Sequence, residues 1–204
     1  MFHLHRRPAV IFLIALALVR VDAATLSPQS ADVFADKIAA IRDLGEQGGR
    51  AGAQRTPLTE DEVNSWFLYR KDRWQSVLPT GVAQPQVTII GQGQVGAQAL
   101  VDLDAVAKRR GRRGGAFDPL TLIGGTVPVN VTGLLHTQAG KARFEVQSAE
   151  ISGIPVPVTV LQELVGYYSR TPERPEGVRL DETFTLPSGI RQVEIGRGQA
   201  VVVQ

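Results

Sequence analysis

A hydrophobic pattern of period two dominates the middle of the chain. From 87 to 103, odd positions carry apolar residues or glycine, and most even positions carry polar ones. Because neighbouring side chains of a strand point to opposite faces of a sheet, this alternation predicts two half-buried strands joined at 91–93. The alternation returns between 127 and 146, around a predicted turn at 139–141. The sequence therefore predicts two β-hairpins.

Three other stretches show the period of three to four residues that is typical of amphipathic helices. Residues 30–44 place apolar side chains on one helix face. Thr59 and Glu62 have the spacing of a capping box, which predicts a second helix that begins here and continues to Leu78. A third, shorter helix is predicted at 160–168.

The C-terminal part of the chain predicts three short strands, at 184–186, 190–195 and 200–203. Strands and helices in this order predict an α+β fold with a mainly antiparallel sheet. We expect one domain at 56–204, preceded at 24–55 by a helix and a glycine-rich connection.

Composition narrows the class of protein. The chain has 204 residues, of which 43% are hydrophobic and 21% charged, as expected for one globular domain with a core. It contains no cysteine, which excludes disulfide bonds, thiolate metal sites and cysteine nucleophiles. Its 22 basic and 20 acidic residues give a net charge of +2, so the composition does not indicate a polyanion-binding protein.

The N-terminus has the pattern of a secretory signal peptide. Arg6 and Arg7 precede an apolar run at 9–19, and the residues before Ala24 allow cleavage there. We therefore predict that residues 1–23 are a signal peptide and that the protein is exported, to the periplasm or out of the cell. The alternative is a retained anchor, although this run is shorter than the about 20 residues that span a bilayer.

Cleavage at this position changes both the charge and the available chemistry. The predicted mature chain carries 19 basic and 19 acidic residues, because three arginines and one aspartate leave with the first 23 residues. Two of the three histidines leave as well, so only His136 remains. This removes most histidine-based sites, and we predict no catalytic residue, no metal ion and no cofactor.

Gly91, Gly93 and Gly96 match the G-x-G-x-x-G pattern of dinucleotide-binding folds. The pattern indicates a nucleotide-dependent enzyme if a helix follows the glycines. The period-two alternation that continues beyond Gly96 favours hairpin glycines instead. Nucleotide binding is therefore the minor alternative.

Five cations lie close together in the chain: Lys108, Arg109, Arg110, Arg112 and Arg113. Anionic phospholipid surfaces attract exposed basic segments by about 1 kcal/mol per residue, so we predict headgroup or membrane contact here. The alternative is a solvated hairpin tip. No aromatic residue is interleaved with these cations, and nucleic acid is not an expected partner.

Three further polar features could form functional sites, but each also fits an ordinary structural position. Asp102 and Asp104 are predicted to share one strand face, where a carboxylate pair or a hard-cation site competes with a plain polar face. His136 suits a hydrolase, but the chain contains no G-x-S-x-G motif, so a surface position beside the turn is preferred. Asn130 begins an Asn-x-Thr glycosylation pattern but lies in a predicted strand.

Four short motifs resemble those of a known family. Residues Pro57–Asn64 resemble its Leu-Thr-Glu-x-Glu-x-Asn helix opening, and Val101–Asp104 resemble its central strand. Ile154–Pro157 and Phe184–Ile190 resemble the start of its later helix and its closing strand. The family is the tubular lipid-binding (TULIP) superfamily, including exported bacterial phospholipid-binding proteins of the LmeA type, and the resemblance spans residues 56–204. It implies a long helix wrapped by a highly curved, mainly antiparallel sheet, a second, shorter helix, and an interior that accommodates acyl chains.

These observations predict an exported, non-enzymatic lipid-binding protein. Acyl chains, or another apolar small molecule, would lie along apolar faces, where each buried CH₂ contributes about 0.8 kcal/mol. The candidate cavity residues are Trp66, Phe67, Val101, Leu103, Val129, Val131, Phe144, Val146, Leu161 and Leu164. For each of them the alternative is closed core packing. For the whole protein the alternative is an envelope scaffold or assembly protein that docks another protein.

Overall fold

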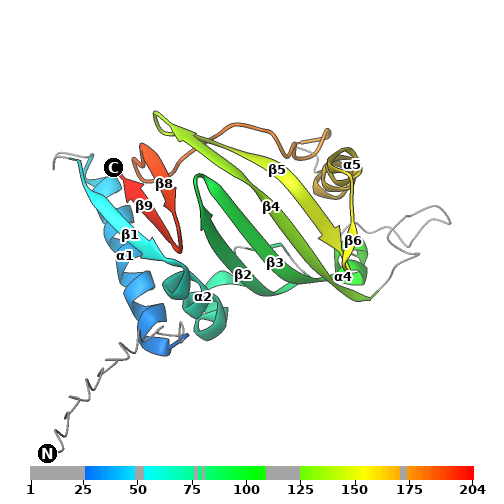
Figure 1. The fold of residues 1–204 in the computed structure, drawn as a ribbon, viewed down its shortest axis with the longest axis horizontal. Helices are drawn as coiled ribbons and strands as arrows, with labels where there is room; N and C mark the ends of the chain where they lie inside the picture. The colour runs from blue at the N-terminus through cyan, green and yellow to red at the C-terminus, as the bar shows by residue number, and fades with distance from the viewer. Residues whose placement is uncertain (1–25, 49–52, 76–77, 80, 109–124, 171–173) are drawn as a thin grey trace, which may run out of the picture.

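A computed structural model describes residues 26–48, 53–75, 78–79, 81–108, 125–170 and 174–204. These residues form five helices and two antiparallel sheets, so the predicted α+β class is confirmed (Figure 1). One sheet has six strands and the other has three. Among the described helices, none combines the length and the apolar character that crossing a membrane requires.

The larger sheet contains both predicted hairpins. Its turns at 92–93, 139–140 and 152–153 each have positive φ at both central residues, which is the turn geometry that suits the twist of a two-residue hairpin. Strands β2 to β6 follow one another in the sheet, and β7 pairs with the far edge of β5. The strands are β2 (Val82–Gly91), β3 (Gln94–Asp102), β4 (Thr126–Gln138), β5 (Lys141–Ile151), β6 (Ile154–Pro155) and β7 (Phe184–Thr185).

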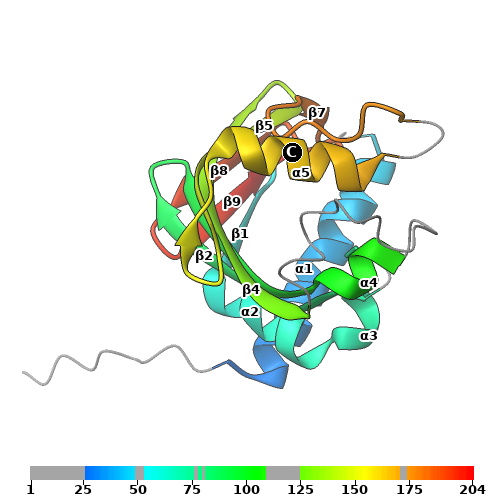
Figure 2. The same ribbon diagram turned by 90° about the vertical axis from the view of Figure 1, so that its right-hand side faces the viewer.

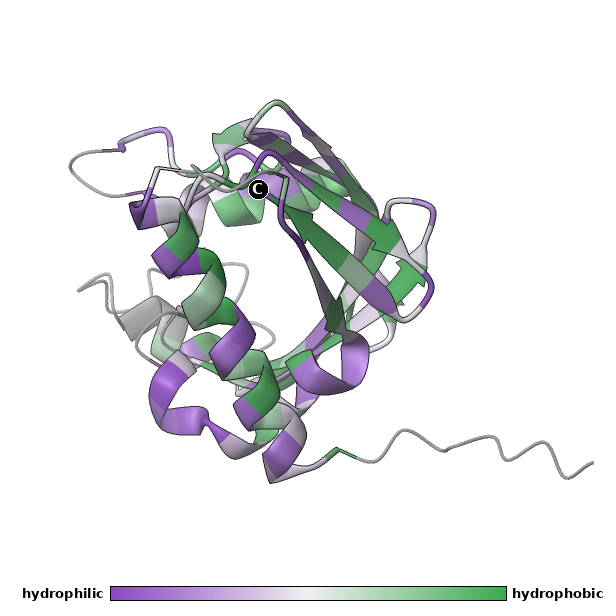
Figure 3. Cartoon of the chain, turned by 90° about the vertical axis from the view of Figure 1, so that its left-hand side faces the viewer, coloured by the Kyte–Doolittle hydropathy of each residue, from purple (hydrophilic) through white to green (hydrophobic). Residues whose placement is uncertain are grey.

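The smaller sheet joins distant parts of the chain in the order β1-β9-β8. Its strands are β1 (Arg55–Thr59), β8 (Gln192–Gly196) and β9 (Gln199–Val203). The helix α1 (Pro28–Glu46) packs on this sheet through a buried cluster of Ile41, Leu58 and Val202. Figure 3 shows hydrophilic and hydrophobic residues alternating along α1, as in the predicted amphipathic helix.

The prediction of one continuous helix from Thr59 to Leu78 is wrong. The structure has α2 (Glu60–Tyr69), then a break at Arg70, then the short helix α3 (Lys71–Trp74). Arg70 leaves the helical conformation, with φ −123° and ψ 46°. The break turns Trp74 back onto α2, where its indole N–H donates to the carbonyl oxygen of Phe67 at 2.8 Å. Trp74 is 3% exposed, so its burial stabilises the break.

The remaining helices are α4 (Leu103–Lys108) and α5 (Val158–Ser169). The prediction that Leu103 continues a strand is wrong, because α4 begins at this residue. α5 confirms the third predicted helix. Figure 2 shows curved strands, with α5 on one side of them and α1 on another, and neither sheet closes into a barrel.

Candidate functional site

One face of the larger sheet is almost entirely apolar. In antiparallel pairing, directly opposite residues share a face, so the register of β2 to β5 defines that face. Its single polar member is Thr137 on β4. We call the following residues the apolar face: Val87, Ile89, Val95, Ala97, Ala99, Val101, Val127, Val129, Val131, Gly133, Leu135, Thr137, Ala142, Phe144, Val146, Ala149 and Ile151.

The opposite face of the same strands is mostly polar. Gln98, Asn130, Thr132 and Glu145 lie there at the intervening positions. This side matches the surface of an ordinary half-exposed sheet. The alternation in the sequence therefore separates a hydrophobic side from a solvated one across four strands.

One end of the apolar face is closed by helices. Leu103 at the start of α4 is 6% exposed and Val127 on β4 is 7% exposed. Val101, Val129, Ile151 and Leu164 pack against these two residues. Four of the ten predicted cavity residues, from four different elements, therefore meet in one cluster. At this end the alternative of closed core packing holds.

In the middle of the apolar face, the described part of the chain leaves several residues partly uncovered, although Ala149 opposite Val131 is 3% exposed and Gly133 is buried. Val131, Phe144 and Val146 are only half-buried, and Ala97 is exposed. We call these four residues the central strip. A Cβ placed on Gly133 would lie 2.6 Å from the Cζ atom of Phe144, so the Phe144 ring lies over this glycine and across β4. The structure thus brings Val131, Phe144 and Val146, three further predicted cavity residues, together on the partly exposed central strip.

Trp66 and Phe67 lie elsewhere. Both are half-buried on α2 in a chain of aromatic rings, with centroids 5.5 Å apart for Phe34 and Trp66 and 5.4 Å apart for Trp66 and Phe67. Phe67 in turn contacts Trp74 edge-on. Leu161, the last predicted residue, is buried on α5. The aromatic pair therefore belongs to the packing of α1, α2 and α3, outside the central strip.

The acidic opening of α2 closes the outer edge of β2. The Asn64 side-chain amide donates to the carbonyl oxygen of Val87 and accepts from its N–H, both at 2.8 Å. The next outward N–H, that of Ile89, donates to a Glu60 carboxylate oxygen at 2.7 Å, and the Ile89 carbonyl accepts from Gly198. Side chains of a helix thus take the place of a neighbouring strand. The sequence motif at 57–64 did not predict that Asn64 and Glu60 would cap the edge of β2.

The rest of the same motif holds α1 and β1. Thr59 and Glu62 form the predicted capping box, with each backbone N–H donating to the other residue's side chain. Glu62 also pairs with Lys37 of α1 at 2.7 Å, and Lys37 donates to the carbonyl oxygen of Pro57. Every one of these groups positions an element. None of them is left free for chemistry.

Thr137 joins the two sheets. Its hydroxyl donates to the carbonyl oxygen of Val193 on β8 at 2.9 Å and accepts from the N–H of the same residue at 3.0 Å. The N–H of Gly93 also donates to Ile195, although this bond is long at 3.5 Å. The Thr137 side chain thus takes the place of a pair of backbone hydrogen bonds between β4 and β8.

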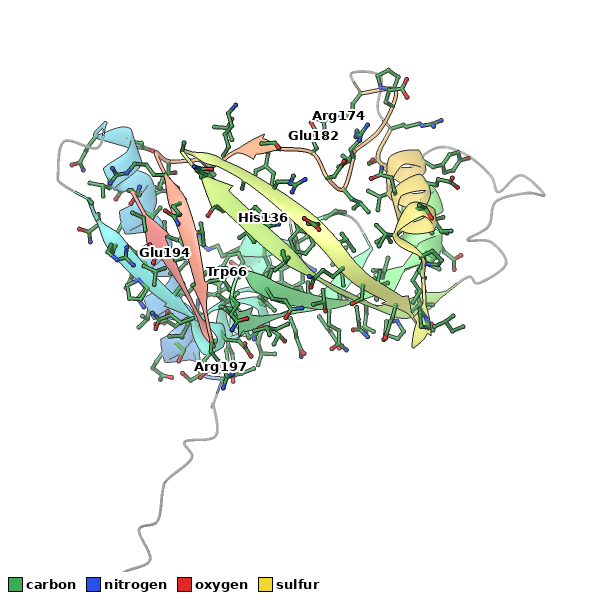
Figure 4. The ribbon with its side chains drawn as sticks, turned by 45° about the horizontal axis from the view of Figure 1, so that its top comes forward. Trp66, His136, Arg174, Glu182, Glu194 and Arg197 are labelled. Carbon is green, nitrogen blue, oxygen red and sulfur yellow. The ribbon has the colours of Figure 1, made fainter. Side chains whose placement is uncertain are left out.

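A solvent-open groove of about 710 Å³ lies beside this junction, and its lining includes Leu135, Thr137 and Ala142 of the apolar face as well as polar residues. His136 on β4 and Glu194 on β8 both line it, and Figure 4 shows them on these two strands. The half-exposed His136 lies 3.2 Å from Glu145, which also pairs with Arg143 at 3.4 Å. His136 thus occupies the predicted surface position. Within the described part of the chain, no group of three or more histidine and acidic side chains has the arrangement of a metal site.

Two exposed ion pairs shift the ionisation of their members. Arg55 holds Glu194 in two hydrogen bonds, of 2.9 and 2.6 Å, and these lower the pKa of Glu194 and raise that of Arg55. The side-chain hydrogen bond of Arg179 lowers the pKa of Asp181 in the same way. Both pairs lie in water, where such pairs add little stability.

The predicted Asp102–Asp104 pair does not share a strand face. Asp102 ends β3, and its carboxylate accepts from the N–H of Ala105 at 2.9 Å in the first turn of α4. Asp104 lies inside α4 and accepts from the N–H of Gly125 at 3.2 Å. Because Asp102 caps the helix, the chain leaves the strand here, and the two carboxylates anchor backbone instead of forming a pair.

The structural premise of the nucleotide hypothesis is also wrong. Gly91 and Gly93 flank the turn between β2 and β3, and Gly96 lies within β3. Strand β3 continues directly after these glycines where the motif requires a helix, so no helix N-terminus faces them to bind a pyrophosphate. Asn130 likewise lies within β4, as predicted.

Several predictions fall outside the described residues. They are the signal peptide at 1–23 and Arg109, Arg110, Arg112 and Arg113; Lys108 is the last residue of α4. Comparison of the chain with protein-family models, curated proteins and solved structures finds no match. The geometry of the apolar face is therefore the ground on which function can be argued.

Proposed function

We propose that this protein is an exported lipid-binding protein that holds acyl chains against the apolar face. The observation that carries the proposal is the central strip, where Ala97 is exposed and Val131, Phe144 and Val146 stay half-buried in the middle of a continuous hydrophobic surface. Apolar surface that is left partly exposed in the middle of a sheet is suited to binding an apolar ligand.

The energetics favour a long apolar ligand. Each CH₂ group that leaves water contributes about 0.8 kcal/mol, so an alkyl chain laid along the central strip gains affinity with its length. The buried cluster around Leu103 and Val127 ends the strip on one side. The Thr137 junction ends it on the other, because its hydroxyl is engaged with β8. An acyl chain bound between these two ends would be held by apolar contacts alone.

The resemblance to the TULIP superfamily supports the same proposal. In that arrangement the helix that opens at Thr59, which is α2 here, and the curved strands would together enclose the acyl chain. Lys108, Arg109, Arg110, Arg112 and Arg113 would attract the anionic headgroup of a phospholipid.

Native mass spectrometry of the protein, purified without detergent, tests this function. We expect adducts of lipid mass on the folded protein, and uptake of phospholipid added to a delipidated sample. Absence of adducts together with failure to take up added phospholipid would contradict the proposal. A stable complex with another envelope protein under these conditions would favour the scaffold alternative.

A further inference from the structure

An apolar tip lies at the end of the molecule opposite α1, where β6 leads into α5 (Figure 1). We call residues 154–160 the apolar tip. Ile154 is 66% exposed, Val158 40% and Val160 44%. Pro155 and Pro157 between them are exposed as well. The chain contains no charged residue from 151 to 162, and Thr159 is the one polar residue of the tip.

The backbone of the tip is held firmly although its side chains face solvent. The Ser152 N–H donates to the carbonyl oxygen of Pro128 at 2.8 Å, and the Val156 N–H donates to that of Ala149 at 2.9 Å. The Leu161 N–H donates to Pro157 and begins the helical bonding of α5. The exposed side chains therefore project from a fixed frame. A fixed frame lowers the entropy lost when they enter another apolar phase.

We propose that the apolar tip inserts into the interface of a lipid bilayer. The tip offers three large aliphatic side chains and two prolines, whereas a stable protein–protein interface takes roughly 20–30 residues from each partner. A bilayer requires no complementary partner surface, and a few apolar side chains suffice for shallow insertion. The size of the patch therefore selects a bilayer surface over a folded partner.

The tip is continuous with the apolar face. Leu161, directly after the tip, is 8% exposed, and Leu164, one turn further along α5, packs against the cluster that closes the end of the face. The outer end of α5 thus meets solvent while the following turns line the interior. This inference rests on the proposed function, because a protein that binds acyl chains has to collect them from a membrane, and the tip lies at one end of the binding surface.

Sedimentation of the full chain with charge-neutral phosphatidylcholine vesicles tests the inference. Because the tip carries no charge, we expect the wild-type protein to bind these vesicles and Ile154→Glu to bind them at least about tenfold more weakly. Ile38→Glu on α1 is the matched control, since Ile38 is 41% exposed at the other end and its variant should bind like the wild type. Equal binding of the Ile154→Glu and wild-type proteins, or no binding of the wild type, would overturn the inference.

A second variant keeps the test independent of folding. Ile154→Trp should show a blue shift of its added emission when the vesicles are present, relative to the wild type with its own two tryptophans. An unshifted difference spectrum would also overturn the inference. Native mass spectrometry separates the two claims. Ile154→Glu should still bind phospholipid added directly to a delipidated sample, whereas a wild type that neither carries adducts nor takes up added phospholipid contradicts the proposed function whatever the vesicles show.

Discussion

Asn64 shows how one side chain can close a sheet edge. Its amide satisfies both outward backbone groups of Val87, and Glu60 satisfies the N–H of Ile89 two residues further. An open strand edge is prone to pair with other chains, so these contacts matter for solubility as well as for stability. The acidic motif at the start of α2 is thus explained by its structural contacts.

Replacing Asn64 by alanine tests this role. We expect Asn64→Ala to lower the free energy of unfolding by about 1–3 kcal/mol, because both polar groups of Val87 lose their partner. Urea denaturation measures the change. Asn130→Ala is the control on the solvated side of β4, and it should change stability by less than about 0.5 kcal/mol. Equal effects of the two substitutions would show that the edge contact contributes nothing specific.

Glu194 predicts a pH dependence at the residue scale. Its hydrogen bonds from Arg55 lower its pKa in the folded state below that of the unfolded chain. The stabilisation is therefore complete above the unfolded pKa and is lost as the pH falls through the folded pKa. Wild type should be more stable than Glu194→Gln at pH 7, and the difference should vanish in acid below the folded pKa. Denaturation curves at several pH values measure it; a difference that grows on acidification has the wrong sign.

At the scale of elements, the junction between the two sheets depends on Thr137. Its hydroxyl is the polar exception on an apolar face, and it bonds both backbone groups of Val193. Thr137→Val keeps the shape and removes these bonds, so we expect a loss of about 1–3 kcal/mol and faster hydrogen exchange at the Val193 amide. Thr132→Val on the opposite face is the matched control. Unchanged exchange at Val193 would contradict the assignment.

The elements also show what local pattern predicts and what it leaves out. Period-two alternation and X-Gly turns specified both hairpins, because these signals act between neighbouring residues. The break at Arg70 was missed, because it depends on Trp74 docking against Phe67. The start of α4 was missed although Asp102 is a good capping residue, because the apolar alternation runs through Leu103.

Local pattern predicted the candidate site residues of the strands but not the surroundings of those on the helices. Val131, Phe144 and Val146 follow from alternation, since the register brings alternating residues to one face. Trp66 and Phe67 were included for their hydrophobicity, but their surroundings depend on how α1 and α2 cross. Which part of the apolar face stays open depends on where α4 and α5 lie, and no pattern within a strand contains that information.

At the scale of the whole molecule, the feature that calls for a function is an apolar face that the described residues bury at its ends and leave partly exposed at its centre. α4 and α5 bury Leu103 and Val127, while Ala97 stays exposed in the same sheet. A closed core would give a better-packed and more stable domain. The open strip is the expected shape for a fold that exchanges an apolar ligand with its surroundings.

The most direct measurement compares two tryptophan substitutions at neighbouring positions of β3. Ala97 and Gln98 are both exposed but lie on opposite faces, so Ala97→Trp fills the central strip and Gln98→Trp does not. Titration with a phospholipid that carries a fluorescent acyl chain, on delipidated protein of matched melting temperature, should show binding at least about tenfold weaker for Ala97→Trp and unchanged for Gln98→Trp. Equal affinities of the two variants would contradict acyl-chain binding on the apolar face.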